Sequence, residues 1–471
     1  MSLELAAFRL YAPYFGYSIY VWGSMISLVM VALSGGYALG GWLADRSRSD
    51  ASLYAVILAS GLYQLVIVFI VHAILVWLWE KPEFTATAIA TLIIFVPPML
   101  GLAATSPFVI RLLAREGQVG ATSGKVYALS TAGSVAGILA TSFFLVPRYG
   151  TRATLELLCA MSIFIGAAGL TIFKRPGVLA FLPLGAFFLV PEAKLPSTVV
   201  WKVESAYNFV AVIRAGGLQI LALNDPHYVQ TIQKANGDWA GYYYEDFALG
   251  PLLVPARRLL VLGLGAGGSI MATRAVAPEI QIDAVEIDPK VVEAATRYFG
   301  LPVSSENLRV HVADARPWLA HDPQTYDLVH VDLYQGGPYI PFYLATLEFF
   351  RSIREHMPTG GLLMMNVLNP GSEHELLYAI GATLKQVFPT VMVLPAGNNS
   401  IVFAFSQHRS LVSVREALRE YAGSAEVRTI AGQAATVITD LQVPLGTLVL
   451  TDDRAPVEEM TRRALRAEAR R

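Results

Sequence analysis

The sequence predicts a multi-pass α-helical membrane domain followed by an α/β Rossmann-like domain with a small N-terminal β-sheet. Two observations predict this fold class. From Tyr17 to Val190 most residues are apolar, and charged residues occur only in short clusters. After Trp201, apolar segments of strand length alternate with helical patterns, which is typical of a mostly parallel, doubly wound sheet.

The length of 471 residues exceeds what one hydrophobic core usually organises. We expect an integral membrane helical domain over 1–195, a small β-sheet and connecting helix over 201–255, a Rossmann-like catalytic domain over 256–410, and a C-terminal extension over 411–471. The single cysteine, Cys159, excludes an internal disulfide and a cysteine-based zinc site, and we expect no metal.

Several uncharged segments are long enough to cross a hydrocarbon core of about 30 Å. They are Tyr17–Ala44, Ala51–Trp79, Phe84–Ile110 and Val126–Pro147, followed by Leu157–Phe173, which is just long enough. A sixth, Gly177–Val190, is as short as a re-entrant or interfacial segment. Pro97-Pro98 should break or kink the third helix, because proline donates no backbone hydrogen bond.

Met1–Phe15 resembles the end of an apolar helix that ought to begin earlier, which suggests that an upstream segment is missing. In the membrane half, Gly36-x-x-x-Gly40 and Gly133-x-x-x-Gly137 allow close contact between helices. Only His72 and Glu156 are ionisable residues within the bilayer. This favours a membrane anchor, which also shapes a lipid-facing entrance, over a transporter.

The soluble half begins with Trp201–Arg214 and Leu218–Leu223, whose alternation and β-branched or aromatic residues predict a small antiparallel sheet. Apolar segments of strand length then follow at Arg258–Leu262, Ile282–Val285, Leu308–Val312, Leu328–Val331, Leu362–Val367 and Thr390–Leu394. Ligands of such sheets bind beyond the carboxyl ends of the strands. Candidate functional residues are therefore sought directly after these segments.

Gly263, Gly265 and Gly267 follow the first of these strands and precede a helix. Bare backbone and a helix N-terminus can approach a ligand closely there. This pattern alone also fits a dinucleotide-binding dehydrogenase or simple tight packing. Glu286 ends the next strand, about twenty residues further on, where a carboxylate can accept hydrogen bonds from two ribose hydroxyls.

Asp314 follows the third strand and can accept a hydrogen bond from an adenine amino group, while the small Ala315 leaves room for the ring. The dinucleotide pattern requires nothing at this position. The combination therefore favours a nucleoside of the S-adenosylmethionine type. Asp332 ends the fourth strand, near the expected sulfonium carbon, where it can deprotonate a nucleophile or stabilise the cation. Its alternative role is to cap the following loop.

With these motifs, Trp201–Phe405 resembles the spermidine synthase (aminopropyltransferase) family, and the whole chain resembles its bacterial membrane-fused members. The match to the family is looser through Thr451–Glu458, and the membrane stretch Tyr20–Arg46 also resembles the fused proteins. The resemblance implies a β-structure before a Rossmann-like domain of the S-adenosylmethionine-dependent transferase type, and usually a homodimer. It also implies polyamine biosynthesis: aminopropyl transfer from decarboxylated S-adenosylmethionine to a diamine, releasing methylthioadenosine.

By position, Glu286 resembles the ribose-binding acid of the family, Asp314 its adenine contact and Asp332 its catalytic base. Gln230 resembles a glutamine near the nucleoside end. Substrate contacts are implied for Tyr243 and Glu245, the first and third residues of a Tyr-His-Glu motif, and for Tyr334 and Gln335 in the loop after Asp332.

Three departures affect the groups that hold cationic amines in the family. Ala266 replaces an acid of the glycine-rich turn, Tyr244 replaces the histidine of Tyr-His-Glu, and Gln335 replaces a second acid. A buried ammonium without a partner costs several kcal/mol, so a diamine would need substitutes. Asp452 and Asp453 are candidates for this role.

Three functions follow as hypotheses. The first is aminopropyl transfer with Asp332 as the base. The second uses S-adenosylmethionine for methyl transfer, aminocarboxypropyl transfer or a lyase or cyclisation reaction. The third is a membrane sensor that binds the nucleoside without turnover. We expect a small-molecule substrate, either a polyamine or a lipid-like molecule, and no nucleic acid.

The predicted orientation follows from basic residues in the short loops. One side has Arg46, Arg48, Arg111, Arg115, Lys125, Lys174 and Arg175, and the other has only Lys81, Arg148 and Arg152. The richer side should be cytoplasmic. If all six segments spanned, the soluble half would lie on the other side, without access to S-adenosylmethionine. We therefore expect the sixth not to cross, which leaves a cytoplasmic catalytic domain at a bacterial inner membrane.

Overall fold

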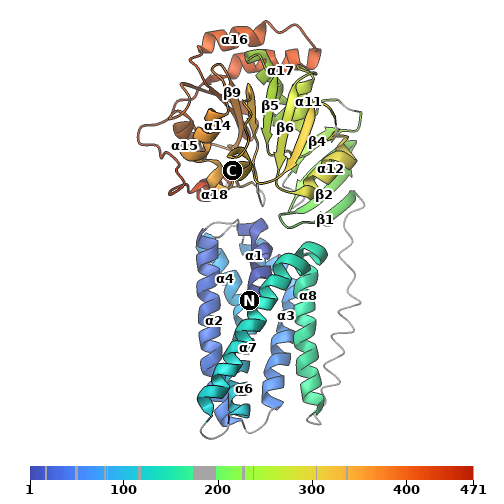
Figure 1. Cartoon of the computed structure of the whole chain (residues 1–471), viewed down its shortest axis with the longest axis vertical. Helices are drawn as coiled ribbons and strands as arrows, with labels where there is room; N and C mark the ends of the chain where they lie inside the picture. Colours follow the sequence, from blue (N-terminus) through green and yellow to red (C-terminus); the bar gives the residue numbers. More distant parts are fainter. Residues whose placement is uncertain are drawn as a thin grey trace. The chain divides into compact units, whose positions relative to one another are not determined.

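The computed structural model describes residues 1–15, 19–47, 51–78, 81, 83–114, 118–172, 198–224, 229–236, 238–303, 305–335 and 338–469. The chain divides into two compact units, Met1–Leu195 and Pro196–Arg471 (Figure 1).

The first unit is helical. Its elements are α1 (Ser2–Phe15), α2 (Ile19–Arg46), α3 (Ala51–Leu78), α4 (Glu83–Ile94), α5 (Val96–Ala103), α6 (Thr105–Leu113), α7 (Val119–Ala140), the π-helical turn η1 (Thr141–Leu145) and α8 (Val146–Ile172). In the described part of the chain, four helical stretches are long and apolar enough to cross a membrane: Val21–Arg46, Ala51–Leu78, Val96–Leu113 and Val119–Thr171.

The third predicted span is interrupted at its prolines, as expected. Helix α4 ends at Ile94 and α5 begins at Val96, because Pro97 and Pro98 have no N–H to continue the hydrogen-bond ladder. The Tyr63 hydroxyl from α3 donates to the carbonyl oxygen of Ile93, at 2.6 Å, which is the oxygen that Pro97 leaves without its helical donor. A side chain of a neighbouring helix thus compensates for the proline.

The glycines of the Gly36-x-x-x-Gly40 motif allow α2 to lie directly against the neighbouring backbone. A Cβ atom at Gly36 would overlap the carbonyl oxygen of Leu100 in α5, and one at Gly40 would overlap that of Ala104. This confirms the predicted close contact for the first motif. The second motif does not bring two backbones together, because a Cβ atom at Gly133 would meet nothing within 4 Å and one at Gly137 would meet the Ser2 side chain.

The fourth and fifth predicted segments are joined rather than separate. Helices α7 and α8 follow each other through η1, and the helical path bends at Gly150, whose φ is 88°. The sixth segment, Gly177–Val190, lies outside the described residues, as do Arg48, Arg115, Lys174 and Arg175. The predicted orientation therefore remains a prediction.

The second unit begins with an antiparallel sheet in the order β1-β2-β3-β4, formed by β1 (Val199–Glu204), β2 (Phe209–Ala215), β3 (Leu218–Leu223) and β4 (Val229–Lys234). The run Trp201–Arg214 is two strands rather than one. Between them, Ser205 and Asn208 donate from their side chains to the Asp288 carboxylate, at 2.6 and 3.1 Å. These hydrogen bonds attach the small sheet to the main domain.

The main sheet has eight strands in the order β12-β10-β11-β9-β8-β5-β6-β7. They are β5 (Arg258–Leu262), β6 (Gln281–Glu286), β7 (Leu308–Val312), β8 (Leu328–Val331), β9 (Leu362–Leu368), β10 (Thr390–Ala396), β11 (Asn399–Phe405) and β12 (Thr439–Asp440). Strands β5 to β9 are parallel, whereas β10, β11 and β12 pair antiparallel. The predicted fold class, helices followed by a mostly parallel Rossmann-like sheet, is confirmed.

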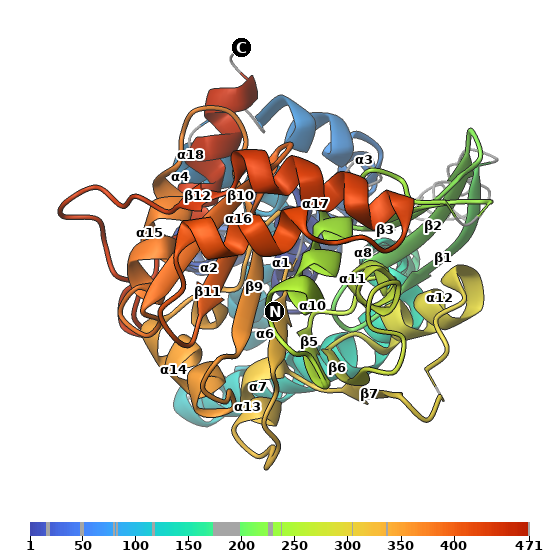
Figure 2. The same cartoon turned by 90° about the horizontal axis from the view of Figure 1, so that it is seen from above.

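Helices cover both faces of this sheet (Figure 2). They are η3 (Tyr243–Leu249), α10 (Gly250–Leu253), α11 (Gly268–Arg274), α12 (Pro289–Phe299), α13 (Ala315–Leu319), η4 (Phe342–Leu344), α14 (Leu347–Glu355), α15 (Glu375–Leu384), α16 (Leu411–Arg419), α17 (Ala425–Val437) and α18 (Val457–Ala469). One core packs α14, α15 and α18 on the sheet, and the other packs η3, α16 and α17 on the opposite face.

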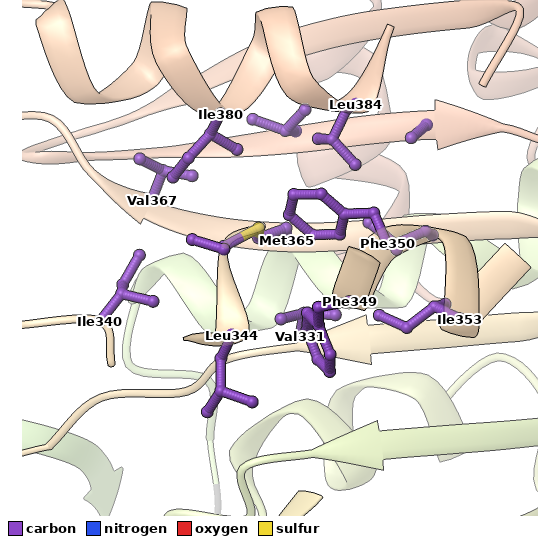
Figure 3. Packing of buried hydrophobic residues seen from close by; sticks show 14 of the residues in the cluster. Val331, Ile340, Leu344, Phe349, Phe350, Ile353, Met365, Val367, Ile380 and Leu384 are labelled. Carbon is purple, nitrogen blue, oxygen red and sulfur yellow. The ribbon is translucent and has the colours of Figure 1, made fainter. Parts of the chain in front are cut away.

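The first of these cores shows how the sheet is covered (Figure 3). Val331 of β8 and Met365 of β9 lie beside Phe349 and Phe350 of α14, all at most 1% exposed. Burying such side chains contributes roughly 1.5–3 kcal/mol each. The parallel strands are thereby held rigidly, and their carboxyl ends can keep polar groups in fixed positions.

His330 is a buried polar residue beside the second core. Its side chain is completely buried, its ring centroid lies 4.5 Å from that of Phe247, and neither ring nitrogen has a hydrogen-bond partner among the described residues. Burial lowers the pKa of His330 to about 3 from its ordinary value near 6.5. The ring is therefore neutral in the folded protein at neutral pH.

Replacing this imidazole by an apolar side chain should stabilise the protein. Two unsatisfied polar atoms cost roughly 1–3 kcal/mol, so His330→Leu should raise the free energy of unfolding by up to that amount. In the native chain His330 binds a proton near pH 6.5 when unfolded but only near pH 3 when folded, so the free energy of unfolding falls as pH falls from about 6.5 toward 3. The His330→Leu variant lacks this group, so its free energy of unfolding should fall less over the same range. Thermal unfolding between pH 7 and 5 measures both effects. His408→Leu, at an exposed position, is the control, and a less stable His330→Leu protein would contradict the expectation.

Candidate nucleoside-binding and catalytic site

The order of the strands produces a switch point at β5. From β5 the chain continues to β6 and β7 on one side and returns to β8 and β9 on the other. A cavity lies at the carboxyl ends of these strands. It is lined by the predicted residues Gln230, Gly263, Gly265, Glu286, Asp314, Ala315, Asp332, Tyr334 and Gln335, together with residues that the sequence did not indicate, among them Asn208 and Tyr343.

The glycine-rich turn brings β5 close to β8. Gly263 has a φ of 90°, and a Cβ atom there would overlap the carbonyl oxygen of Asp332. The turn is also joined to the small sheet, because Thr231 of β4 accepts a hydrogen bond from the Ala266 N–H at 3.0 Å. Gly267, with a φ of 84°, lies at the N-cap of α11 and does not line the cavity.

The carboxylate of Glu286 is oriented by two backbone donors. One oxygen accepts from the Leu264 N–H at 3.1 Å and the other from the Asp288 N–H at 2.9 Å. Burial raises the pKa of Glu286 to about 7, and these two hydrogen bonds oppose the rise. Each carboxylate oxygen retains capacity to accept another hydrogen bond, as a pair of ribose hydroxyls would require.

Asp314 is the N-cap of α13 and is held by two donors. Its Oδ1 accepts from the Arg316 N–H at 3.1 Å, and its Oδ2 accepts from the Tyr343 hydroxyl at 3.0 Å. Ala315 beside it is buried and lines the same cavity. Tyr343 thus connects the loop after β8 to the predicted adenine end.

Asp452 and Asp453 do not reach the cavity. The carboxylate of Asp452 makes a bidentate pair with the Arg316 guanidinium, at 2.5 and 2.7 Å, and also accepts from the Thr346 hydroxyl at 2.7 Å. Arg316 lowers the pKa of Asp452. Asp453 is exposed. Asp452 therefore holds Arg316, which lies next to Asp314 and Ala315 at the predicted adenine end. Neither Asp452 nor Asp453 lies where an anchor for the substrate amine was expected.

The Asp332 carboxylate lies between two side-chain donors from other elements. The Tyr243 hydroxyl donates to Oδ2 at 3.0 Å, and the Asn366 amide donates to Oδ1 at 2.9 Å. The Asn366 amide oxygen in turn accepts from the Asn399 amide at 2.7 Å. Neither of these donors belongs to the following loop, so the carboxylate is held as part of a network and not as a loop cap.

Burial raises the pKa of Asp332 to about 6, while the hydrogen bonds from Asn366 and Tyr243 oppose the rise. Burial and the neighbouring Asp332 carboxylate also raise the pKa of Tyr243 well above its usual value. The phenol therefore remains a donor, and Asp332 can exchange a proton near neutral pH.

Asn366 was missed by sequence reasoning. It lies within the apolar strand β9, in Leu362–Leu368, and is 1% exposed. A single amide in an otherwise apolar buried strand needs a hydrogen-bond partner, and this feature of the sequence could have indicated that Asn366 contacts a polar residue of the site. Tyr334 is placed beside the same strand: its hydroxyl accepts from the Leu368 N–H at 2.8 Å and donates to the Asn366 carbonyl oxygen at 3.3 Å.

Three sequence positions discussed for amine binding are not among the residues that line the cavity. The Tyr244 hydroxyl bonds to the backbone of Ile232, and Glu245 accepts from the N–H groups of Ala240 and Gly241. Ala266 packs into an apolar cluster with residues of the small sheet and α12. Gln335 lines the cavity, and its backbone N–H donates to the Tyr339 carbonyl oxygen at 2.9 Å.

Comparisons with known proteins find one family model and several relatives of the second unit. The family described as "Spermine/spermidine synthase domain" matches residues 248–412. A probable polyamine aminopropyl transferase of Bifidobacterium longum is 29% identical over 288 residues, 57% of this chain and 64% of that protein, so the chain spans less than two thirds of this relative.

Two other relatives differ in activity. A polyamine aminopropyltransferase of Vibrio vulnificus is 31% identical over 225 residues, 45% of this chain and 73% of that protein. An "eEF1A lysine and N-terminal methyltransferase" of Mus musculus is 29% identical over 151 residues, 30% of this chain and 21% of that protein.

The contact at Gly263 gives a direct test of the cavity. Gly263→Ala should weaken methylthioadenosine binding at least tenfold, because its Cβ would force β5 away from Asp332 and its φ of 90° disfavours alanine. Titration calorimetry measures the affinity. Gly432→Ala is the matched control, since a Cβ at this helical position meets nothing within 4 Å. Unchanged affinity in Gly263→Ala would mean that the nucleoside binds elsewhere.

Proposed function

We propose that this chain, which belongs to the spermidine synthase (polyamine aminopropyltransferase) family, transfers the aminopropyl group of decarboxylated S-adenosylmethionine to an amine. The observation that carries the proposal is Asp332, a carboxylate with a raised pKa at the switch point of the sheet, held by Tyr243 and Asn366 and facing the predicted nucleoside cavity. Perturbed carboxylates in such cavities are candidates for acid–base chemistry.

The charge of the cavity supports the decarboxylated donor. Its lining includes the carboxylates of Glu286, Asp314 and Asp332, and no lysine or arginine is among the described lining residues. Intact S-adenosylmethionine has an additional carboxylate, which would meet negative groups without a basic partner. The decarboxylated donor has only a sulfonium and an ammonium to place there. Glu286 would hold the ribose hydroxyls, and Asp314 would accept from the adenine amino group.

The reaction is a direct displacement. The lone pair of a neutral acceptor nitrogen attacks the propyl carbon beside the sulfonium, a C–N bond forms, and the C–S bond breaks with its electron pair going to sulfur. Methylthioadenosine leaves, and Asp332 accepts the proton that the acceptor nitrogen loses as it attacks. Holding the two reactants in line would supply much of the rate.

The acceptor is an amine whose binding does not require the acidic and histidine side chains that hold a second ammonium in the family. Tyr244, Glu245 and Asp452 are engaged in hydrogen bonds elsewhere in the unit. Tyr334 and Gln335 remain beside Asp332 and line the cavity. Neutral hydrogen-bonding groups suit a monoamine or one end of a longer amine better than a second, fully buried ammonium. We further propose that the apolar helices anchor the enzyme in a membrane.

Product analysis tests the reaction. The full-length protein in detergent is incubated with decarboxylated S-adenosylmethionine and, separately, with S-adenosylmethionine, each with and without putrescine or propylamine. The proposal expects methylthioadenosine together with an aminopropylated amine, and only with the decarboxylated donor. S-adenosylhomocysteine as the product would contradict it.

A second candidate function is cleavage of the sulfonium donor without an external acceptor. The engagement of Tyr244, Glu245 and Asp452 outside the cavity favours it, because an intramolecular reaction needs no second ammonium site. Methylthioadenosine released from intact S-adenosylmethionine, equally fast with and without amine, would favour this lyase.

Removing the carboxylate should stop turnover but not binding. Asp332→Asn should lower kcat by about 10²–10⁴-fold, the usual contribution of a general base, and should change the affinity for methylthioadenosine by less than about fivefold. Asp453→Asn, at an exposed carboxylate outside the cavity, is the control and should retain full activity. Full activity in Asp332→Asn would exclude the proposed base, whereas nucleoside binding without any turnover in the native protein would favour the binding-only sensor.

The pH dependence tests the network around the base. Asp332 must be ionised to accept a proton, so kcat should rise with pH through about 6. Asn366→Ala removes a donor that favours the charged carboxylate, so the midpoint should move to higher pH. The measurement is kcat against pH for the native protein and for Asn366→Ala with the same acceptor amine. Titration of the amine affects both curves equally, so the difference between their midpoints reports on Asp332. A midpoint that stays in place or moves to lower pH would contradict the assigned role of Asn366.

A further inference from the structure

The second unit contains an open groove, separate from the catalytic cavity. Its volume is about 630 Å³, within the range of small-molecule sites in proteins. Three segments form its walls: residues 214–219 of the hairpin between β2 and β3, residues 233–235 at the end of β4, and residues 298–300 at the end of α12. Among the described residues, none lines both this groove and the catalytic cavity.

Three polar side chains form a row across the small sheet in this groove. In the register of the strands, Arg214 of β2 pairs with Gln219 of β3, and Gln219 pairs with Gln233 of β4. Side chains of directly paired residues lie on the same face of a sheet. Two residues earlier and later on these strands, Val212 and Leu221 share that face and belong to an apolar cluster with residues of α12. The polar row therefore continues this face beyond the apolar cluster, at the end of α12.

The Arg214 guanidinium is oriented by its neighbour in this row. Its Nε donates to the Gln219 side-chain oxygen at 2.7 Å, and the Gln219 amide nitrogen donates to the carbonyl oxygen of Tyr298 in α12. The two terminal nitrogens of Arg214 make no hydrogen bond or ion pair with the described residues. A guanidinium that is held at Nε presents its terminal N–H groups for a bidentate contact with an oxyanion.

Lys234 brings a second positive charge to the groove. Its side chain is half-buried at the end of β4, and it forms no ion pair within 4 Å among the described residues. Burial raises the pKa of Glu245, and the charge of Lys234 is one of the effects that oppose this rise, but Glu245 does not line the groove. The described lining residues include no aspartate or glutamate. The groove therefore has two basic side chains and no acidic one to neutralise them.

The end of α12 does not neutralise them either. Carbonyl oxygens at the C-terminus of a helix are partly negative. Here the Tyr298 oxygen accepts from Gln219, and the Ala295 oxygen accepts from the N–H groups of Gly300 and Leu301. These oxygens are therefore paired, and the free hydrogen-bonding groups of the charged side chains in the groove are donors.

A phosphate monoester fits this arrangement better than a carboxylate does. It has three terminal oxygens and a charge of about −1.5 to −2 near neutral pH. Two of the oxygens would pair with the fork of Arg214, and the third would meet the ammonium of Lys234. A carboxylate has only two oxygens and one negative charge. Because the groove is larger than a phosphate group, it also has room for the organic part of the ligand.

We propose that this groove binds a phosphate monoester, with its phosphate on Arg214 and Lys234. This chemistry is shared by soluble organic phosphates and by the head group of phosphatidic acid. The residues of the site all belong to the second unit and lie outside the catalytic cavity, so the site does not depend on the proposed reaction.

Titration calorimetry on the full-length protein in detergent at pH 7.5, with glycerol 3-phosphate as the probe, tests the site. One probe should bind per chain. Arg214→Gln should weaken binding at least tenfold, and Arg214→Lys, which keeps the charge but loses the bidentate fork, at least threefold. Lys234→Gln should weaken it at least fivefold. Arg309→Gln is the matched control, because it makes the same change of charge at an exposed position of β7 outside the groove.

Thermal unfolding checks that each variant is folded. Native affinity in folded Arg214→Gln and Lys234→Gln overturns the proposal, and so does a native protein that does not bind the probe. Equal weakening by Arg309→Gln also overturns it, because the probe would then respond only to the overall charge of the protein.

Nanodiscs separate the soluble source from the lipid source. The full-length chain is placed in phosphatidylcholine nanodiscs with and without phosphatidic acid, and the affinity for glycerol 3-phosphate is measured in both. Weaker binding of the probe in the presence of phosphatidic acid would support the proposal with the lipid head group as the occupant. Equal binding in both would support it with a soluble organic phosphate as the occupant.

Discussion

Asp332 keeps a carboxylate at a buried sheet edge, and the hydrogen bonds from Tyr243 and Asn366 are the interaction on which the proposed chemistry depends. Burial alone would favour the protonated acid, which cannot accept a proton. Two donors directed at the two oxygens recover part of the stability of the charged form, so the pKa of Asp332 rises only to about 6. The close approach of Gly263 to the Asp332 backbone fixes where this carboxylate lies.

The predicted adenine end of the cavity is held in place by a residue that is remote in the sequence. Asp452, far along the chain, pairs with Arg316, and the Arg316 guanidinium also donates to the Tyr343 carbonyl oxygen at 2.9 Å. Tyr343 then holds Asp314 through its hydroxyl. The Arg316 and Asp452 side chains are 28% and 43% exposed, so their ion pair adds little to global stability. Its effect is to limit the positions available to the loop over the cavity.

Sequence reasoning located the glycine turn, Glu286, Asp314 and Asp332 because each directly follows a strand, and the carboxyl ends of parallel strands meet at one edge. Their roles in binding and catalysis are still proposals. Other features depended on contacts that periodicity does not encode. The Tyr244 side chain starts from a 3₁₀ turn and its hydroxyl bonds to the backbone of β4, and the partner of Asp452 is remote in sequence. Strand β4 was missed because its sequence, Val-Gln-Thr-Ile-Gln-Lys, is mostly polar.

The central claim is that an acidic cavity without a basic partner selects a donor that lacks a carboxylate. The most direct measurement is the pair of dissociation constants for decarboxylated and intact S-adenosylmethionine, obtained by calorimetry on the full-length protein at pH 7.5 and in low salt. The account predicts at least tenfold tighter binding of the decarboxylated donor, and a smaller difference in Asp332→Asn. Tighter binding of intact S-adenosylmethionine would contradict it.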